Sequence, residues 1–245
     1  SSLRECVGGG EPLLPAVFNE WKDITGVEMI NGLGISELLH IFISASGDDI
    51  KPGAIGKAVP GFEVRVVDEN MEDVKPGEIG LMIVKGPNGC RYLDDVEKQK
   101  AYIEDGWNKS GDLCRIDEDG YFYYEARTDD MILTGGYNVS GLEVEAVLLE
   151  HPKVREAAVV GTPDKDRGQI VKAFIILKTA DAKSDETVSE LQNFVKSQIS
   201  AFKYPRAVEF VDELPLTATG KIQRGALRQL ERERAEKAGL IQKGT

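Results

Sequence analysis

The sequence has no long apolar segment and fewer basic than acidic residues, and each shortage excludes a class of protein. No stretch approaches the roughly 20 apolar residues that a membrane-spanning helix needs, so we expect no membrane span. Lysine and arginine number 30 against 42 acidic residues, which gives a formal net charge of −12. Nucleic acids and anionic membranes favour basic surfaces, so we predict no nucleic-acid partner.

Cysteine is also scarce. Cys6, Cys90 and Cys114 are odd in number and lack the spacing of metal ligands, and neither histidine lies near them in sequence. We therefore predict a reducing, cytoplasmic compartment and no structural zinc. Residues 1–5 contain neither the apolar core of a signal peptide nor an initiator methionine, which suggests a fragment or a processed chain.

What the chain does have is enough apolar surface to fold. With 245 residues, 41% of them apolar, it can bury one substantial core or two modest ones. Residues 53–127 alternate short apolar runs with glycine, proline and aspartate, which predicts a β-rich region. After Asp130 the pattern is mixed, so the predicted fold class is α+β. The expected later elements are strands at 157–160 and 173–177 and helices at 188–199 and 226–237; segments 15–25 and 36–44 fit either a helix or a strand.

The most informative segment is the loop 215–222, whose small residues present Lys221 just before a predicted helix. A flexible loop of this kind can place an ammonium group where negative charge develops. A Walker phosphate loop would need glycine first and serine or threonine after the lysine, whereas Pro215 and Ile222 occupy these places. The alternative that stays open is a solvated lysine in a turn.

Three further segments could contact a nucleotide. The turn at Gly8–Pro12 lets the backbone approach a planar base, although a plain turn is the better reading of this motif by itself. In segment 31–37, the Ser36 hydroxyl could bond a phosphate and the Glu37 carboxylate could bind Mg²⁺, or Ser36 could simply cap a helix. Asp112, which follows a predicted turn, could accept hydrogen bonds from two ribose hydroxyls, or it could be a solvated hairpin residue.

Taken in order, these segments resemble the signature motifs of the adenylate-forming superfamily, which includes acyl-CoA synthetases, firefly luciferase and the adenylation domains of peptide synthetases. The resemblance covers essentially all 245 residues, and its order and spacing make it specific. The matching segments are Gly10-Glu11-Pro12, Gly34-Ile35-Ser36-Glu37, Gly77-Glu78-Ile79-Gly80, Ser110-Gly111-Asp112, Ala126-Arg127-Thr128-Asp129, Gly135-Gly136-Tyr137-Asn138-Val139 and Thr219-Gly220-Lys221.

The resemblance implies roles for individual residues. Lys221 would be the catalytic lysine, Glu37 the metal ligand and Asp129 the hinge. The nucleotide would be bound by Gly10, Glu11, Pro12, Asn31, Ser36, Asp112 and Arg127. Coenzyme A would be bound by Gly135, Gly136, Phe202 and Arg206, although the last two residues could instead mark a helix end followed by an edge strand.

The resemblance also implies an organisation. Residues 1–126 would be the C-terminal portion of a large, β-rich AMP-binding domain, 127–129 a hinge, and 130–245 a small mobile α+β domain. Ala126 and Leu133 depart from the glycine and lysine of many relatives. The Ser/Thr/Gly-rich phosphate loop of the family is absent from the 245 residues. We therefore expect an N-terminal half of the same enzyme, and we expect the isolated chain to be inactive.

The implied activity is ATP- and Mg²⁺-dependent ligation of a carboxylic acid to coenzyme A. The run 32–42 looks closest to benzoate-type CoA ligases, in which His40 would contact an aromatic acid. A partly buried histidine with satisfied hydrogen bonds is the alternative for His40, and we read His151 as a loop residue. Two functional alternatives also stay open: a medium-chain or general acyl-CoA synthetase, and a non-catalytic nucleotide- or CoA-binding module that needs a partner.

Overall fold

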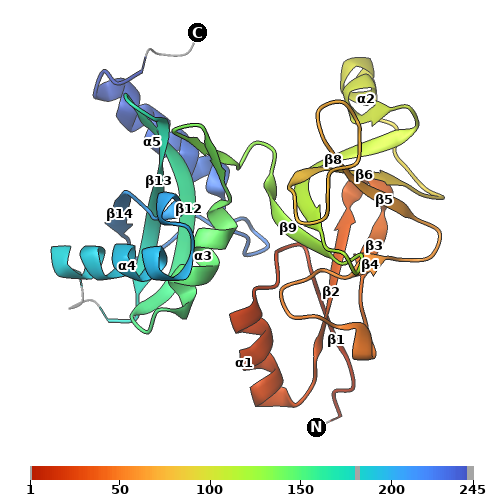
Figure 1. Ribbon diagram of the computed structural model, residues 1–245, viewed down its shortest axis with the longest axis horizontal. Helices are drawn as coiled ribbons and strands as arrows, with labels where there is room; N and C mark the ends of the chain where they lie inside the picture. The colour runs from red at the N-terminus through yellow and green to blue at the C-terminus, as the bar shows by residue number, and fades with distance from the viewer. Residues whose placement is uncertain (1, 180–182, 242–245) are drawn as a thin grey trace. The chain divides into compact units, whose positions relative to one another are not determined.

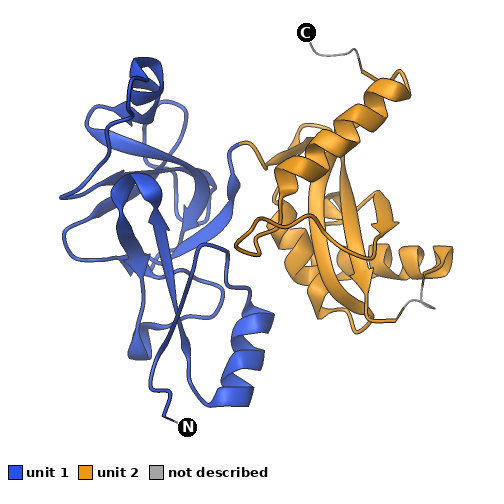
Figure 2. Ribbon diagram, turned by 180° about the vertical axis from the view of Figure 1, so that it is seen from behind, with its two compact units in different colours: residues 1–128 blue, residues 129–245 orange. Residues whose placement is uncertain are grey.

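The chain consists of two compact units, residues 1–128 and 129–245, in a computed structural model that describes residues 2–179 and 183–241 (Figures 1 and 2). Each unit has its own hydrophobic core. In the described part of the chain, no helix is long and apolar enough to cross a membrane.

Unit 1 contains two sheets. The first has four strands in the order β1-β2-β3-β4; the second has five, in the order β5-β6-β8-β7, with β9 paired to β8. The strands are β1 (Cys6–Gly9), β2 (Met29–Ile35), β3 (His40–Ser44), β4 (Lys57–Ala58), β5 (Glu63–Val67), β6 (Gly80–Lys85), β7 (Ile103–Glu104), β8 (Trp107–Ile116) and β9 (Phe122–Arg127). The helices are α1 (Pro15–Thr25), α2 (Val96–Tyr102) and the short 3₁₀ turns η1 (Ser36–Leu38) and η2 (Gly47–Asp49).

The core of unit 1 joins its two sheets. Phe42 and Ile43 from the first sheet pack with Met82, Val84 and other buried residues of the second. The backbones also meet, because an isolated bridge pairs the segment just before β4 with the start of β9 through two hydrogen bonds of 2.8 Å. Both sheets therefore form one body, and the predicted nucleotide residues lie on the strands and turns of that body.

Unit 2 is built on one five-stranded sheet, ordered β11-β10-β13-β12 with β14 paired in parallel to β13. The longest pairing is the antiparallel one between β12 and β13; β13 lies inside the sheet and β12 at its edge. The elements are β10 (Ile132–Thr134), β11 (Tyr137–Val139), α3 (Gly141–Glu150), β12 (Val154–Asp164), β13 (Gly168–Leu177), α4 (Asp185–Gln198), η4 (Ala201–Lys203), β14 (Ala207–Phe210) and α5 (Arg224–Lys237).

Helices cover both faces of this sheet. Successive residues of a strand point to opposite faces, so each face of β12 packs against different helices. Ala157 and Val159 face one side and pack with residues of α3 and α4. Ala158 and Val160 face the other and pack with Leu227 of α5. Figure 1 shows α5 separated from α3 and α4 by the strands. Burial on both faces explains why β12 and β13 read as nearly continuous apolar runs.

Local signals in the sequence account for the helix ends. The α1 helix begins with Pro15 at its first turn and ends at Gly26, whose φ of +72° suits a glycine after the last turn. Ser140 and Ser184 cap α3 and α4 by accepting hydrogen bonds from Glu143 N and Thr187 N, at 3.3 and 3.2 Å.

The predicted α+β fold is confirmed. The strands expected at 157–160 and 173–177 lie within β12 and β13, and the two expected later helices correspond to α4 and α5. Segment 15–25 is the helix α1. Segment 36–44 is a 3₁₀ turn followed by the strand β3, because Leu39, at φ +57°, ends the turn.

Candidate functional site

Lys221 lies at the end of a tight hairpin turn between β14 and α5 in unit 2. An isolated bridge pairs Leu216 with Ile222, and Thr217 N donates to Lys221 O at 2.8 Å. Thr217 Oγ1 in turn accepts from Lys221 N at 3.0 Å, and Gly220 adopts a φ of +84° at the turn. The loop thus has a defined backbone and carries a half-buried lysine.

Directly after this loop, the first residue of α5 makes a buried ion pair that the sequence analysis missed. Arg224 donates from Nε to Glu145 Oε1 at 3.0 Å and from Nη2 to Glu145 Oε2 at 2.6 Å. Glu145 is only 3% exposed, and it also accepts from Val159 N at 2.7 Å. One carboxylate of α3 therefore joins β12 to the start of α5.

Asp112 lies inside strand β8, which corrects the expectation of a solvated residue after a hairpin turn. It is buried, at 3% exposure, and it lies at a bulge where β8 shifts register against β6. Ser110 Oγ donates to Met82 O at 2.8 Å across this bulge and accepts from Asp112 N at 3.1 Å. Gly111, with φ +74°, supplies the backbone conformation that makes the bulge possible.

Arg127 is the residue opposite Asp112 on the neighbouring strand β9. Its Nη1 lies 3.6 Å from Asp112 Oδ1, and Tyr124 donates to the same oxygen at 3.4 Å. Burial, and then the charge of Asp112, raise the pKa of Tyr124 well above its usual range. The structure thus brings two predicted nucleotide residues together as a carboxylate beside a half-exposed guanidinium.

Glu37 and Ser36 lie in the 3₁₀ turn η1. The alternative in which Ser36 caps a helix is wrong, because Ile35 occupies the cap position without a side-chain hydrogen bond, and Ser36 is exposed. Tyr92 donates to Glu37 Oε1 at 2.8 Å. Burial, and then this hydrogen bond, raise the pKa of Tyr92 to about 12, so the hydroxyl remains a donor at neutral pH.

Glu37 could bind a magnesium ion only together with other ligands. Among the residues that the structure describes, no group of three acidic, histidine or cysteine side chains is arranged to hold a metal ion. Mg²⁺ commonly binds one or two carboxylates together with substrate phosphates and water, and a single carboxylate whose second oxygen is not used by Tyr92 suits that mode.

The predicted adenine loop follows strand β1, which pairs in parallel with β2. In this register Gly8 lies beside Asn31, so the turn formed by Gly10, Glu11 and Pro12 follows directly from the strand next to Asn31. Gly10 adopts φ +87°, and both it and Glu11 are exposed. The backbone of Asn31 is held in place, since its main-chain carbonyl oxygen accepts a hydrogen bond from Ser44 Oγ at 2.7 Å.

His40 begins strand β3 and is exposed, so the alternative of a partly buried histidine is wrong. Its Nδ1 lies 2.8 Å from Ile41 O. Gly34 pairs with Ile41, the residue after His40, and a Cβ at Gly34 would lie 2.5 Å from His40 O. His151 does lie in a turn, as expected, but it is buried at 4% exposure and contacts Glu190 and Phe194.

Three of the four predicted CoA residues lie around an exposed aromatic pair in unit 2. Gly135 and Gly136, both with positive φ, form the turn between β10 and β11. The next residue, Tyr137, stacks on Phe202 of η4 with ring centroids 4.5 Å apart. Arg206 lies just before β14 and donates to Tyr204 Oη at 3.0 Å. The predicted helix end followed by an edge strand at this place is also present, so both readings stay open.

Asp129, the predicted hinge, is the first residue of unit 2. Arg228 of α5 lies 3.4 Å from its carboxylate and also contacts Asp130. In unit 1, Thr128 N donates to Gly111 O at 2.9 Å, so the last residue of that unit is still bonded to strand β8.

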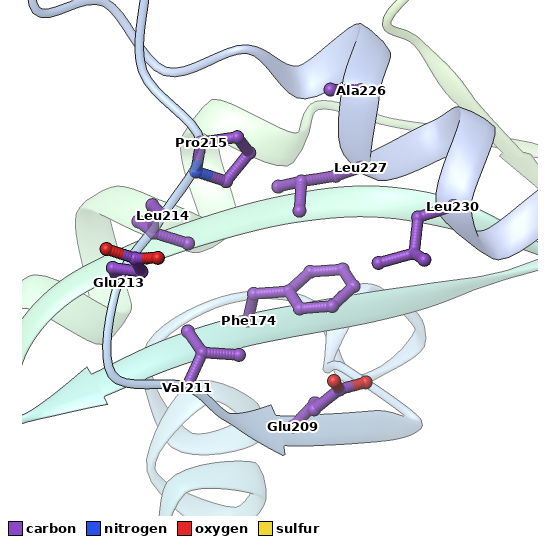
Figure 3. A pocket seen from close by; sticks show the side chains of 9 residues that line it. All are labelled: Phe174, Glu209, Val211, Glu213, Leu214, Pro215, Ala226, Leu227 and Leu230. Atoms are coloured by element: carbon purple, nitrogen blue, oxygen red, sulfur yellow. The ribbon is translucent and has the colours of Figure 1, made fainter.

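A pocket of about 330 Å³ lies between α5 and the sheet of unit 2 (Figure 3). Phe174, Leu214, Leu227 and Leu230 supply apolar walls, and Pro215, at the base of the Lys221 loop, borders it. No motif in the sequence pointed to this pocket.

Comparison with known proteins identifies the family. A sequence model of AMP-binding enzymes matches residues 1–92, and a model of the AMP-binding enzyme C-terminal domain matches residues 143–221. The chain belongs to the AMP-binding enzyme family. The resemblance to adenylate-forming enzymes is therefore confirmed, together with the expectation that these residues form the later part of such an enzyme.

Relatives and solved structures agree with this assignment. The acyl-coenzyme A synthetase ACSM4, mitochondrial, of Mus musculus is 44% identical over 95% of this chain and 42% of its own length. The structure of the anthranilate CoA ligase AuaEII with anthranoyl-AMP is 42% identical over 96% of this chain and 46% of that one, with a TM-score of 0.89. A benzoate CoA ligase from Burkholderia xenovorans LB400 is 40% identical over 93% and 46%, with a TM-score of 0.85. The chain thus spans less than half the length of these proteins.

Proposed function

We propose that the chain is the C-terminal portion of an ATP-dependent ligase that joins a carboxylic acid to coenzyme A through an acyl-AMP intermediate. The observation that carries this proposal is the match along nearly the whole chain to a protein named as an acyl-coenzyme A synthetase, at 44% identity. The buried Asp112 beside the half-exposed Arg127, and the ordered Lys221 loop, supply groups suited to this chemistry. The N-terminal half of the same enzyme would supply the phosphate loop.

In the first step, the acid attacks the α-phosphate of ATP and pyrophosphate leaves. The ammonium of Lys221 would stabilise negative charge on the reacting phosphate and carboxylate, a contribution of about 2.7–4 kcal/mol for one such donor. Asp112 would accept hydrogen bonds from ribose hydroxyls, and Arg127 would bind ribose or phosphate. The turn Gly10–Pro12 with Asn31 would hold the base, Ser36 a phosphate oxygen, and Glu37 would ligate Mg²⁺.

In the second step, the thiol of coenzyme A attacks the acyl-AMP and AMP leaves. Gly135 and Gly136 would allow the pantetheine arm to pass close to the backbone, because glycine has no Cβ. Phe202 offers an exposed aromatic face to the adenine of coenzyme A, and Arg206 a guanidinium to its phosphate. A rotation at Asp129, the hinge, would exchange the two active arrangements.

An aromatic acid is our proposed substrate class, with His40 in contact with it. Its support is the likeness, at 42% and 40% identity, to ligases named for anthranilate and benzoate. A medium-chain or general acyl-CoA synthetase is the second candidate, because the Mus musculus relative is named only as an acyl-coenzyme A synthetase. Its name also includes a mitochondrial location, so the cytoplasmic compartment stays a prediction. A panel of aromatic and aliphatic acids, compared by kcat/KM, would separate the two classes.

The test of the activity measures each half-reaction in a full-length ligase that contains this sequence. We expect Lys221→Ala to lower pyrophosphate release by about 100- to 1,000-fold and to leave thioester formation from supplied acyl-AMP nearly unchanged. Equal losses in both steps would contradict the role of Lys221. The 245-residue chain alone should release no pyrophosphate from acid, ATP and Mg²⁺, and turnover by it would contradict the need for a phosphate loop elsewhere.

The hinge has a separate test in the same ligase. Asp129→Pro fixes φ near −65° at this position, so it should slow the CoA step while adenylation continues. An unchanged rate of thioester formation from acyl-AMP would rule out a pivot at this residue.

A further inference from the structure

The Lys221 loop holds its own shape, but its internal hydrogen bonds cannot fix its position in unit 2. The bonds among Thr217, Gly220 and Lys221 all lie within the turn. The two ends of the loop attach it to the rest of unit 2. On one side, Leu214 is buried at 6% exposure beneath α5. On the other side, Arg224 is the third residue after Lys221 and makes the ion pair with Glu145.

The ion pair between Arg224 and Glu145 fixes the orientation of the arginine as well as its distance from the carboxylate. Two parallel donors of one guanidinium meet the two oxygens of one carboxylate, at 3.0 and 2.6 Å, which sets both distance and orientation. The Arg224 side chain is 15% exposed and that of Glu145 only 3%. Glu145 is itself held, because one of its oxygens accepts from Val159 N. Arg224 is thereby attached to the edge of the sheet and to α3 together.

The helix that Arg224 begins gives no reason for an arginine there. The first turn of α5 has no acidic residue, and Gln223 at the cap position makes no side-chain cap. A cation near a helix N-terminus is disfavoured by the helix dipole, so the helix alone would favour aspartate or glutamate at this end. The two hydrogen bonds to Glu145 give the arginine a favourable partner at this position.

We propose that Arg224 and Glu145 are positioning residues for Lys221, and that their bidentate pair sets where the ammonium group stands during adenylation. The inference rests on the proposed function, in which Lys221 acts in the first half-reaction. A displacement of about 1 Å in a reacting group can cost about a hundredfold in rate. Loss of the pair should therefore slow adenylation even though neither residue needs to touch the substrates.

The first arm of the test needs only the 245-residue chain. Hydrogen–deuterium exchange read by mass spectrometry reports the bonded amides of Thr217, Gly220 and Lys221. Arg224→Met should speed their exchange at least tenfold relative to β13, and Arg224→Lys less, since an ammonium cannot form both bonds. Arg232→Met, an exposed substitution on the same helix, is the matched control and should change nothing. Unchanged loop exchange, or an equal rise throughout unit 2, would overturn the anchoring.

The second arm measures the half-reactions of the full-length ligase. Arg224→Met and Glu145→Gln should lower the kcat of adenylation tenfold or more and spare thioester formation from acyl-AMP. Added to Lys221→Ala, Arg224→Met should cause no further loss, because it acts through that lysine. A further loss in the double variant, or equal losses in both steps, would overturn the proposal. If Lys221→Ala itself leaves adenylation intact, the proposed function fails, while the exchange arm still decides whether the pair anchors the loop.

Discussion

Replacing Lys172 should destabilise unit 2 strongly, because this lysine is buried among charges on the α5 face of the sheet. It is 9% exposed and donates to Glu231 at 2.8 Å and to Glu209 at 2.7 Å. Glu231, 4% exposed, also accepts from Thr162 and from Arg234, both at 2.8 Å. The network ties β12, β13 and β14 to α5.

The magnitude follows from these contacts. Lys172→Met removes two hydrogen bonds to carboxylates, each of which contributes roughly 1.5–3 kcal/mol. Because Arg234 still contacts both Glu209 and Glu231 and compensates part of the loss, we expect the lower end, about 3 kcal/mol. Lys172→Met with Glu231→Met should recover most of this loss, since removing both charges of a buried pair is often nearly neutral.

Urea unfolding can isolate this effect, since both tryptophans lie in unit 1 and the helices α3 to α5 lie in unit 2. Far-UV circular dichroism should report the loss, while tryptophan fluorescence should stay unchanged. Lys183→Met removes an exposed ion pair with Asp212 and is the control, with an expected cost of at most about 1 kcal/mol. A loss below about 1 kcal/mol for Lys172→Met, or a double variant as unstable as the sum of the single ones, would refute the reasoning.

Two predictions concern unit 1, and tryptophan fluorescence during unfolding checks both. Burial alone would raise the pKa of Asp117, but hydrogen bonds led by the one from Lys51 outweigh it and lower that pKa to about 2. The ionised Asp117 should therefore stabilise the fold above about pH 4, and this stabilisation should be lost between pH 4 and 2. Asp117→Asn should flatten that loss, and an unchanged dependence of stability on acid pH would contradict the prediction. Gly56→Ala should lower the free energy of unfolding by at least about 2 kcal/mol, because φ is +135° and a Cβ would overlap the backbone of Ser44. Gly61→Ala, at φ +94° but with open space around the Cβ, is the control and should lower it clearly less. Equal losses of stability in the two variants would count against the steric argument.

Much of unit 2 could be predicted from the sequence, because its elements carry strong local signals. Long apolar runs mark β12 and β13, and a periodic apolar pattern marks α4. Each signal is longer than a turn, so the element can be predicted without knowledge of its tertiary contacts. Ser184 likewise marks the start of α4, because its side chain accepts a hydrogen bond from the backbone of the first turn; in unit 1, Gly26 marks the end of α1 in the same local way.

Segments whose conformation depends on tertiary contacts could not be predicted in the same way. Asp112 follows a glycine that reads as a turn, yet the strands on either side absorb this glycine as a bulge and bury the aspartate. Segment 36–44 was ambiguous because a single residue, Leu39, leaves the helical region and separates the 3₁₀ turn from β3, which begins at His40.

The charged anchors were missed for a different reason. Arg224 and Glu145 are 79 residues apart in sequence, and no local pattern links them. Lys172 did leave a signal, since a lone lysine between apolar neighbours of a buried strand requires a charged partner nearby.

The carboxylate of Glu145 has one more consequence, which concerns solubility. Strand β12 is long and apolar and lies at the edge of its sheet, where unpaired backbone groups invite another chain to add a strand. At Val159 the outward N–H is already bonded to Glu145, and at the same residue Gly141 brings the backbone of α3 so close that a Cβ there would lie 2.7 Å from Val159 O. The helix therefore blocks strand addition at Val159, and we expect loss of Glu145 to free this backbone amide to pair with another chain.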